Sequence, residues 1–482
     1  MMKKAGSSDK GVRAHQLRNV VGCLKLRNNV VWSIVWIVAC VNLFFLIGVD
    51  ALFGNKKRKQ REAELLAKKL AEEAARRQKI YFAIAFIVVV LVGIGSYIYF
   101  EGPLGIRKGK KGNRPGVEGT VDVVVVGCGL PKKSMGWYHI TQLLEMKNVN
   151  LRAIIEPFFL NPDLCKDVPS SFSEFVTKTS DLGVQFAPNI EDLPKFQKLT
   201  LCLIAARTAD NPNLFKQCIE RGAKCIFLEK PGAPSVEELR EMKELADSKN
   251  VKVYVGFNKH VTPYVRNAMA LSRQVEDSHV FFSHNNSYET KDLAEVFTRN
   301  PEGMMKNMCV HELALLNTFF GVSVETIAKF KVNTGALFSQ KLTVWQPGTA
   351  MPNPKYITDF SRCAFKITTT KGKSISVMAD RCGGNVSFAV VKDANGMEVK
   401  KFEFPDDQLM KKVSAMIKED PEMMPYFFIQ SDDYLELKKL VVNSLLDNSP
   451  HAEEIATIDT AIEALRLAEY CTEKLESALK AA

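Results

Sequence analysis

Residues 121–130 read VDVVVVGCGL and give the first strong indication of the fold. The nearly continuous β-branched run is typical of a strand buried on both faces of a parallel sheet. Gly127 and Gly129 follow directly, and a helical pattern begins near Gly136. Glycines at such a turn let backbone amides approach a pyrophosphate at the helix N-terminus. Because Pro-Lys-Lys-Ser is inserted into the usual GxGxxG spacing, an ordinary strand–turn–helix is the alternative interpretation.

An acidic residue ends the next predicted strand, Leu151–Ile155, at the separation expected for dinucleotide binding. Glu156 lies 20 residues after Gly136, where a carboxylate accepts hydrogen bonds from a ribose diol. This favours NAD, whereas Lys132 and Lys133 leave NADP open, either as phosphate contacts or as solvated loop charges. The residues of this turn that we expect to bind the cofactor are Gly127, Cys128, Gly129, Gly136 and Glu156.

Further strand–helix units follow the first one. The patterns predict strands at 199–205, 225–228 and 251–257, and helices at 213–221 and 235–248. Ser235 and Glu238 have the spacing of a capping box at the start of the second helix. Alternating strands and helices predict a parallel, doubly wound sheet whose ligand site lies at the carboxyl ends of its strands.

The segment 225–260, with FLEKP, a helix and VGFNKH, resembles the glucose–fructose oxidoreductase/inositol dehydrogenase family (Gfo/Idh/MocA). The resemblance implies an NAD(P)-binding Rossmann domain over 117–258. It also implies an α+β domain over 259–482, with a mainly antiparallel sheet that covers the nicotinamide and often forms homo-oligomers. Glu229, Lys230 and Pro231 are then expected in the cofactor cleft.

The same resemblance implies the catalytic residues. Lys230 would orient a substrate hydroxyl, and His311, on a helix predicted over 301–321, would act as the general base. Asn307, one turn before His311 on the same helix face, stands where the family has an aspartate. An amide cannot stabilise an imidazolium by charge, so we expect a weakened base or no dehydrogenation; a histidine satisfied within the core is the other interpretation. Glu312 is the candidate to substitute for the missing acid, but its side chain points about 100° away from that of His311 around the helix.

The second half of the soluble part has the pattern of strands joined by tight turns. Lys371-Gly372 and Asn395-Gly396 predict hairpins, and 432–479 is helical with a break near 448–450. Zinc-ligand spacing, GxSxG and the P-loop motif are absent from the sequence. We therefore expect no metal site, and neither serine hydrolase nor P-loop NTPase activity is predicted.

The basic charge of the chain is confined to its N-terminal quarter. Residues 1–116 hold 22 Lys+Arg and 7 Asp+Glu, whereas the remaining residues hold 43 and 47. The larger part is mildly acidic and offers no basic field to a phosphate backbone, so we expect no nucleic-acid partner.

The basic quarter has the pattern of a membrane hairpin. Residues 30–49 and 80–100 carry no charge, and each stretch is long enough to cross a bilayer. A basic helical connector at 55–79 and a Gly/Lys-rich linker at 101–116 complete a unit spanning 1–116. A buried core helix is the alternative for both stretches, and a cleaved signal peptide is a further one for the first.

Two spans place both chain ends on one side of the membrane. The 11 cysteines form no CxxC pair, which favours reduced thiols on the cytosolic face. Two glycosylation sequons, at Asn285 and Asn385, keep a lumenal placement open.

The sequence thus predicts a two-pass, membrane-anchored NAD(P)-dependent oxidoreductase. Its small-molecule substrate would carry a CH–OH group, as a polyol, a sugar or a sugar derivative. The first alternative is a catalytically impaired nucleotide-binding regulator or membrane scaffold with the same fold. The second is a structural membrane protein that binds a protein partner and no cofactor.

Overall fold

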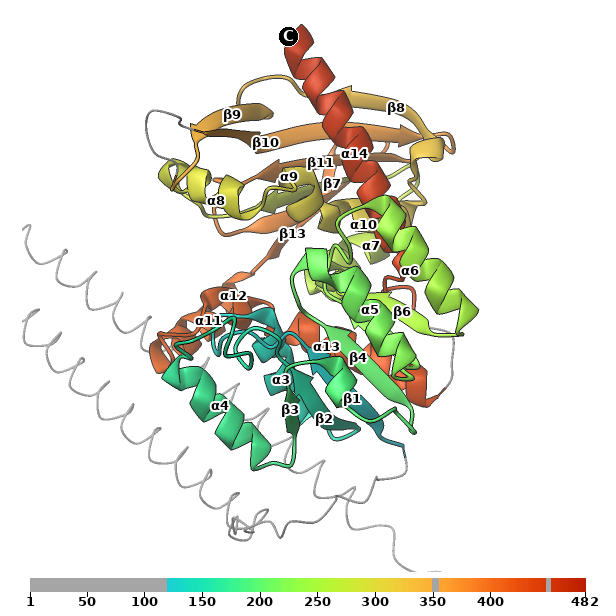
Figure 1. Cartoon of the computed structure of the whole chain (residues 1–482). Helices are drawn as coiled ribbons and strands as arrows, with labels where there is room; N and C mark the ends of the chain where they lie inside the picture. Colours follow the sequence, from blue (N-terminus) through green and yellow to red (C-terminus); the bar gives the residue numbers. More distant parts are fainter. Residues whose placement is uncertain (1–118, 349–354, 448–451) are drawn as a thin grey trace, which may run out of the picture. The chain divides into compact units, whose positions relative to one another are not determined.

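The computed structural model describes residues 119–348, 355–447 and 452–482 (Figure 1). The predicted membrane hairpin, with its spans at 30–49 and 80–100, lies outside these residues. Within the described ranges, none of the helices combines the length and apolar character needed to cross a bilayer.

The first sheet has six parallel strands in the order β3-β2-β1-β4-β5-β6. The order runs outward in both directions from β1, which is the arrangement of a doubly wound Rossmann sheet. Its strands are β1 (Val121–Val126), β2 (Val149–Ile155), β3 (Gln185–Ala187), β4 (Thr200–Ile204), β5 (Cys225–Leu228) and β6 (Lys252–Val255).

Four helices connect these strands. They are α3 (Met135–Glu145), α4 (Ser170–Ser180), α5 (Asn211–Glu220) and α6 (Val236–Ser248). The predicted cap of α6 is present, since the Ser235 side chain accepts the Glu238 N–H. All side chains of β4 and β5 are buried, as expected for strands covered on both faces.

The second sheet has seven strands, in the order β13-β12-β7-β11-β10-β8 with β9 paired to β10. Every pairing is antiparallel except that of β7 with β11. The predicted hairpin turns join β10 to β11 and β12 to β13. The strands are β7 (His279–Asn285), β8 (Ile327–Val332), β9 (Gln340–Trp345), β10 (Tyr356–Thr369), β11 (Ser374–Asp380), β12 (Ser387–Lys392) and β13 (Glu398–Phe404).

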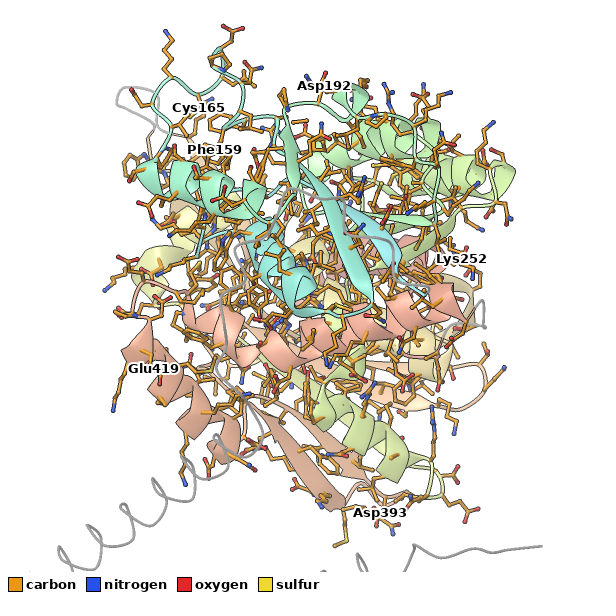
Figure 2. All side chains as sticks on the ribbon, turned by 90° about the horizontal axis from the view of Figure 1, so that it is seen from below. Phe159, Cys165, Asp192, Lys252, Asp393 and Glu419 are labelled. Atoms are coloured by element: carbon orange, nitrogen blue, oxygen red, sulfur yellow. The ribbon has the colours of Figure 1, made fainter. Side chains whose placement is uncertain are left out.

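Eight further helices follow β6 in the described part of the chain. They are α7 (Pro263–Ser272), α8 (Leu293–Arg299), α9 (Met304–Asn307), α10 (Val310–Phe320), α11 (Asp407–Glu419), α12 (Pro425–Ile429), α13 (Ser431–Leu446) and α14 (Ile458–Ala481). In Figure 1, α14 runs alongside α6 and α10 and reaches β8. The interior is filled by side chains, and the labelled charged residues Asp192 and Glu419 lie at the periphery of the view in Figure 2.

The C-terminal part of the chain returns to the first sheet. Leu437 and Val441 of α13 belong to the same buried cluster as Val121 and Val123 of β1. Further along, the Val255 N–H donates to the Ala456 carbonyl at 2.9 Å, so this segment covers the edge strand β6. The domain boundary that we expect at 258/259 stays a prediction, and α13 packs on the Rossmann side of it.

The helix predicted over 301–321 is wrong as a single element. It divides into α9 and α10 at Met308 and Cys309. The Cys309 N–H donates to the Met304 carbonyl, five residues earlier, so the turn is one residue wider than an α-helical turn. Asn307 and His311 therefore lie on two different helices rather than on one face of the same helix.

Candidate active site

The glycine turn after β1 has the backbone geometry of a dinucleotide-binding loop. Gly127 and Gly129 have φ angles of 83° and 63°, which favour glycine. Gly136, near the start of α3, would place a Cβ atom 1.8 Å from the Gly127 carbonyl oxygen. Its role in close helix–strand packing is thus kept despite the inserted residues. Gly127 and Gly129 carry no Cβ atoms into this turn before α3, which is the part of such a loop that a pyrophosphate approaches.

Glu156 faces this turn from the end of β2. One carboxylate oxygen accepts the Cys128 N–H at 2.9 Å and the Gly129 N–H at 2.7 Å, and the other accepts the Phe158 N–H at 3.1 Å. The acid predicted to bind a ribose diol is therefore close to the glycine turn and holds its backbone. Burial, and then the negative charge of Glu156, raise the pKa of the Cys128 thiol.

The inserted residues are anchored to the C-terminal segment. Lys132 Nζ forms ion pairs with Asp420 at 2.9 Å and with Glu422 at 3.3 Å. Lys133 is exposed. Of the two lysines considered as phosphate contacts, Lys132 is thus already paired with carboxylates.

Glu229, at the end of β5, contacts a buried histidine of α3. Lys438 Nζ donates to His139 Nδ1 at 2.9 Å, and His139 Nε2 then donates to a Glu229 oxygen at 2.8 Å. Burial lowers the pKa of His139 to about 4, and it lowers the pKa of Lys438 to about 7. This chain of contacts fixes the strand end that carries Lys230, and Pro231 beside it is buried.

Lys230 and His311 line one cavity of about 470 Å³ between the two sheets. Lys230 Nζ donates to the Asn307 carbonyl at 3.0 Å, and burial lowers the pKa of this lysine. The Asn307 side-chain amide donates instead to Asn300 and Glu302. The three residues predicted to be catalytic are thus brought together, but Asn307 contributes a backbone contact and does not support His311.

His311 is buried next to the edge of Phe257, with ring centroids 5.8 Å apart. Its Nδ1 has no hydrogen-bond partner within the described part of the chain. Burial lowers the pKa of His311 well below its usual range, and the positive charges of Lys230 and Lys259 lower it further. The imidazole is therefore neutral near pH 7.

Lys259 and His284 were not predicted to lie at this site, and both contact Glu312, the residue next to His311 in the chain. Glu312 is buried, and its two carboxylate oxygens contact Lys259 Nζ at 2.5 Å and His284 Nδ1 at 2.8 Å. Lys259 and His284 both line the same cavity. Lys259 follows β6, so its place near the carboxyl ends of the parallel strands was the available signal. His284 comes from the second sheet, and no local pattern places it there.

Amide and hydroxyl groups supply much of the remaining cavity wall. They hydrogen-bond a neutral polyhydroxylated molecule as readily as they do water. They belong to Asn258, Asn285, Asn286, Ser287, Tyr288, Asn385, Ser387, Tyr426 and Gln430.

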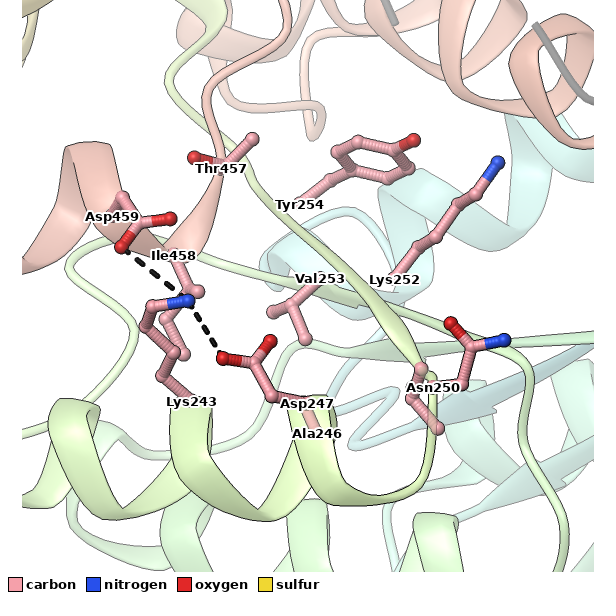
Figure 3. A pocket seen from close by; sticks show the side chains of 11 residues that line it. Lys243, Ala246, Asp247, Asn250, Lys252, Val253, Tyr254, Thr457, Ile458 and Asp459 are labelled. Atoms are coloured by element: carbon pink, nitrogen blue, oxygen red, sulfur yellow. Dashed lines mark hydrogen bonds and ion pairs between the residues drawn. The ribbon is translucent and has the colours of Figure 1, made fainter. Parts of the chain in front are cut away.

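A second cavity, of about 390 Å³, lies beside the edge strand β6 and is lined by residues of α6, of β6 and of the start of α14 (Figure 3). Lys243 of α6 forms an ion pair with Asp247 of the same helix at 2.8 Å and reaches Asp459 of α14 at 3.7 Å. Because the glycine turn and Lys230 are not among its lining residues, this cavity is separate from the candidate active site.

Comparison with known proteins supports an NAD-binding oxidoreductase fold. Residues 121–257 match the model of the GFO_IDH_MocA family, described as an oxidoreductase family with an NAD-binding Rossmann fold. A search of curated proteins finds no match. The first domain is thus similar to the NAD-binding Rossmann domain of this oxidoreductase family over residues 121–257.

Solved structures share the fold over both sheets. Myo-inositol 2-dehydrogenase from Lactobacillus plantarum is 16% identical, with a TM-score of 0.51, and the match covers 74% of this chain and 98% of that chain. Apo scyllo-inositol dehydrogenase from Lactobacillus casei is 14% identical, with a TM-score of 0.51, 75% of this chain and 97% of that chain being covered. GenD2 from gentamicin A biosynthesis, solved in complex with NAD, is 16% identical, with a TM-score of 0.52 and coverages of 78% and 98%.

Proposed function

We propose that this protein is an NAD-dependent oxidoreductase acting on a CH–OH group of a polyol, a sugar or a sugar derivative. The observation that carries the proposal is the shared cavity of Lys230 and His311, which lies between the two sheets and is lined by amides and hydroxyls. A bound nicotinamide would supply hydride acceptance and donation. The residues that would hold the cofactor are Gly127, Cys128, Gly129, Gly136, Glu156, Glu229, Lys230 and Pro231.

The protein's own residues would orient the substrate and remove a proton. Lys230 is at the carboxyl end of β5, where its ammonium donates a hydrogen bond to the substrate oxygen. The positive charge there stabilises the alkoxide-like state that develops as hydride leaves. Its present partner is a backbone carbonyl, which a substrate oxygen can replace without leaving a buried charge unpaired.

A second candidate function is a nucleotide-binding regulator or membrane scaffold that lacks turnover. Asn307 favours it, because its side-chain amide donates to Asn300 and Glu302 and, in the described part of the chain, His311 Nδ1 has no acidic partner. Both candidates require cofactor binding. Only the oxidoreductase requires reduced nicotinamide to form.

Three further expectations from the sequence stay proposals. The uncharged stretches at 30–49 and 80–100 support a two-pass membrane anchor, with the catalytic part on the cytosolic face. The open second sheet supports a homo-oligomer. Lys133 keeps NADP in consideration beside NAD.

Cofactor titration of the full chain tests the proposed function. NADH and NADPH would be followed by nicotinamide fluorescence and by thermal unfolding. Ligand at 100 times its dissociation constant is expected to stabilise the protein by about 2.7 kcal/mol. Formation of reduced nicotinamide would then be measured with NAD⁺ and a panel of inositols and sugars. Binding without turnover would favour the regulator, and absence of binding at millimolar concentration would contradict both candidates.

A further inference from the structure

Two histidines line the candidate active site, and they differ in their polar partners. Among the described residues His311 Nδ1 has no hydrogen-bond partner, and the charges that lower the pKa of this ring most are those of Lys230 and Lys259. A proton taken up by this ring would add a positive charge beside two others, with no carboxylate in contact. His311, which the family resemblance implies as the general base, therefore lacks a carboxylate to stabilise its protonated form.

His284 has the partner that His311 lacks. Its Nδ1 lies 2.8 Å from a carboxylate oxygen of Glu312, which is 1% exposed. The pKa of Glu312 is lowered to about 2 by His284 and Lys259, against the opposing effect of burial, so this group is a carboxylate at neutral pH. A carboxylate on Nδ1 fixes the tautomer that carries its hydrogen there and leaves the Nε2 lone pair to accept a proton.

The rest of the surroundings keep this geometry in place. Lys259 Nζ contacts the other oxygen of Glu312 at 2.5 Å, so the carboxylate is held from both sides. The ring centroids of His284 and His311 are 6.3 Å apart, and both side chains line the same cavity. Within the described residues, His284 Nε2 makes no hydrogen bond that would compete with a substrate.

We propose that His284 is the proton acceptor of this active site and that Glu312 is the residue that positions it. The inference rests on the proposed oxidoreductase function. In the oxidative direction, the substrate C–H bond breaks and its electron pair leaves as hydride to NAD⁺. The O–H bond breaks, the proton goes to His284 Nε2, and the C=O bond forms. The proton then passes to solvent, and the reverse sequence reduces the carbonyl.

The charged and titratable groups facing His284 come from α10, from the end of β5 and from the segment after β6. They are Glu312 and His311 of α10, Lys259 after β6, and Lys230 at the end of β5. Burial lowers the pKa of His284, the two lysines lower it further, and Glu312 raises it. The ring is therefore neutral and able to accept a proton near pH 7, and Glu312 makes it more basic than it would otherwise be.

Three histidine variants of the full chain test the proposal. Turnover would be measured with NAD⁺ and the best substrate from a panel of myo-inositol, scyllo-inositol and D-glucose. His284→Gln is expected to lower kcat by about 10²–10⁴-fold, the usual contribution of a general base. His311→Gln is expected to lower it by less than about tenfold. His279→Gln, at the other end of β7, is the matched control and is expected to leave kcat unchanged.

The Glu312→Gln variant separates positioning from a purely structural role. The amide keeps an oxygen acceptor but loses the charge that raises the pKa of His284. The acidic limb of the pH profile of kcat/KM is therefore expected to move to lower pH, with a lower plateau. Added imidazole is expected to restore part of the activity of His284→Ala, because the shortened side chain leaves room for a diffusible base in place of the ring. NADH affinity and thermal unfolding would show that each variant is folded.

The outcomes distinguish the inference from the function on which it rests. If the wild-type protein turns over a substrate and His311→Gln loses more activity than His284→Gln, the function stands and the inference is overturned. An unmoved pH limb in Glu312→Gln would overturn the positioning role. If the wild type binds NADH but turns over no member of the panel, the proposed function fails, and the assignment of a proton acceptor fails with it.

Discussion

Glu156 and Gly129 are joined across the first strand–helix turn by a hydrogen bond of 2.7 Å, in which the backbone N–H of the glycine donates to the carboxylate. The same oxygen accepts the Cys128 N–H. The acid at the end of β2 thus holds the loop on which a dinucleotide would lie. Ribose binding would use a carboxylate that is already in place and oriented.

Replacing Glu156 by alanine is therefore expected to have two effects. Three backbone N–H groups lose their acceptor, so the free energy of unfolding should fall by about 1–3 kcal/mol. NADH affinity should fall by about tenfold, which corresponds to the loss of one charge-assisted hydrogen bond. Denaturant unfolding and fluorescence titration measure the two quantities. Glu145→Ala, an exposed glutamate at the end of α3, is the control, and wild-type NADH affinity in Glu156→Ala would remove Glu156 from the cofactor site.

Gly136 is the residue of the turn that least tolerates a side chain. An alanine Cβ would lie 1.8 Å from the Gly127 carbonyl oxygen and 2.8 Å from the Cys128 Cα atom, and both of these are backbone atoms. Gly136→Ala is expected to destabilise the fold at or above the upper end of the ~1–3 kcal/mol typical of overpacking. It should also weaken NADH binding, because α3 must move away from β1.

The matched control for this change is Gly335→Ala. A Cβ atom there meets side-chain atoms no closer than 3.4 Å, which is ordinary contact. Thermal unfolding of both variants measures the difference. Equal melting temperatures for Gly136→Ala and the wild type would contradict close packing of α3 on the glycine turn.

The parts of this fold that could be predicted from the sequence are those set by local patterns. The buried valines of β1 and the cap at Ser235 depend on neighbouring residues, and the structure confirms both. The six parallel strands follow from the alternation of strands and helices. The glycine turn was predictable for the same reason, since backbone conformation limits which residues fit there.

One missed part is a local irregularity, and the other depends on a contact between distant residues. A wider turn at Cys309 separates Asn307 from His311, and its apolar sequence carries no Gly or Pro to signal it. Glu312 does point away from His311, as the helical angle requires. However, the Glu312 carboxylate contacts His284 of the second sheet, and His284 lines the same cavity as His311. His284 and Glu312 are 28 residues apart in the chain, so their contact depends on tertiary packing and cannot be predicted from the pattern of one helix.

Asp433 gives the protein a pH-dependent stability. This α13 carboxyl is 5% exposed, and its Oδ2 has no hydrogen-bond partner in the described part of the chain. Burial, with Asp432 adding to it, raises the pKa of Asp433 to about 8. The folded state therefore holds a proton that the unfolded state releases near pH 4. Stability from this group is present below that pH and is lost as the pH rises toward 8.

Asp433→Asn is expected to remove this pH dependence. The variant should match the wild type near pH 4 and exceed it at pH 9 by a few kcal/mol, since each pKa unit corresponds to about 1.4 kcal/mol. Denaturant unfolding at a series of pH values measures the difference. Asp447→Asn, an exposed residue just after the same helix, is the control. A constant difference across the pH range would show that Asp433 does not titrate in this way.

Lys132 and Lys133 separate two interpretations of the inserted loop. Lys132 is paired with Asp420 and Glu422, and such partly exposed pairs contribute little to stability because water and salt screen them. A lysine held by two carboxylates is a poor ligand for a cofactor phosphate.

Lys132→Ala is therefore expected to leave the ratio of NADPH to NADH affinity within about twofold of the wild type, as fluorescence titrations at low and high salt would show. Lys133→Ala is the matched comparison, because the Lys133 side chain is exposed. A tenfold loss of NADPH affinity, with NADH affinity kept, in Lys132→Ala would show that the lysine leaves its carboxylates to bind the cofactor.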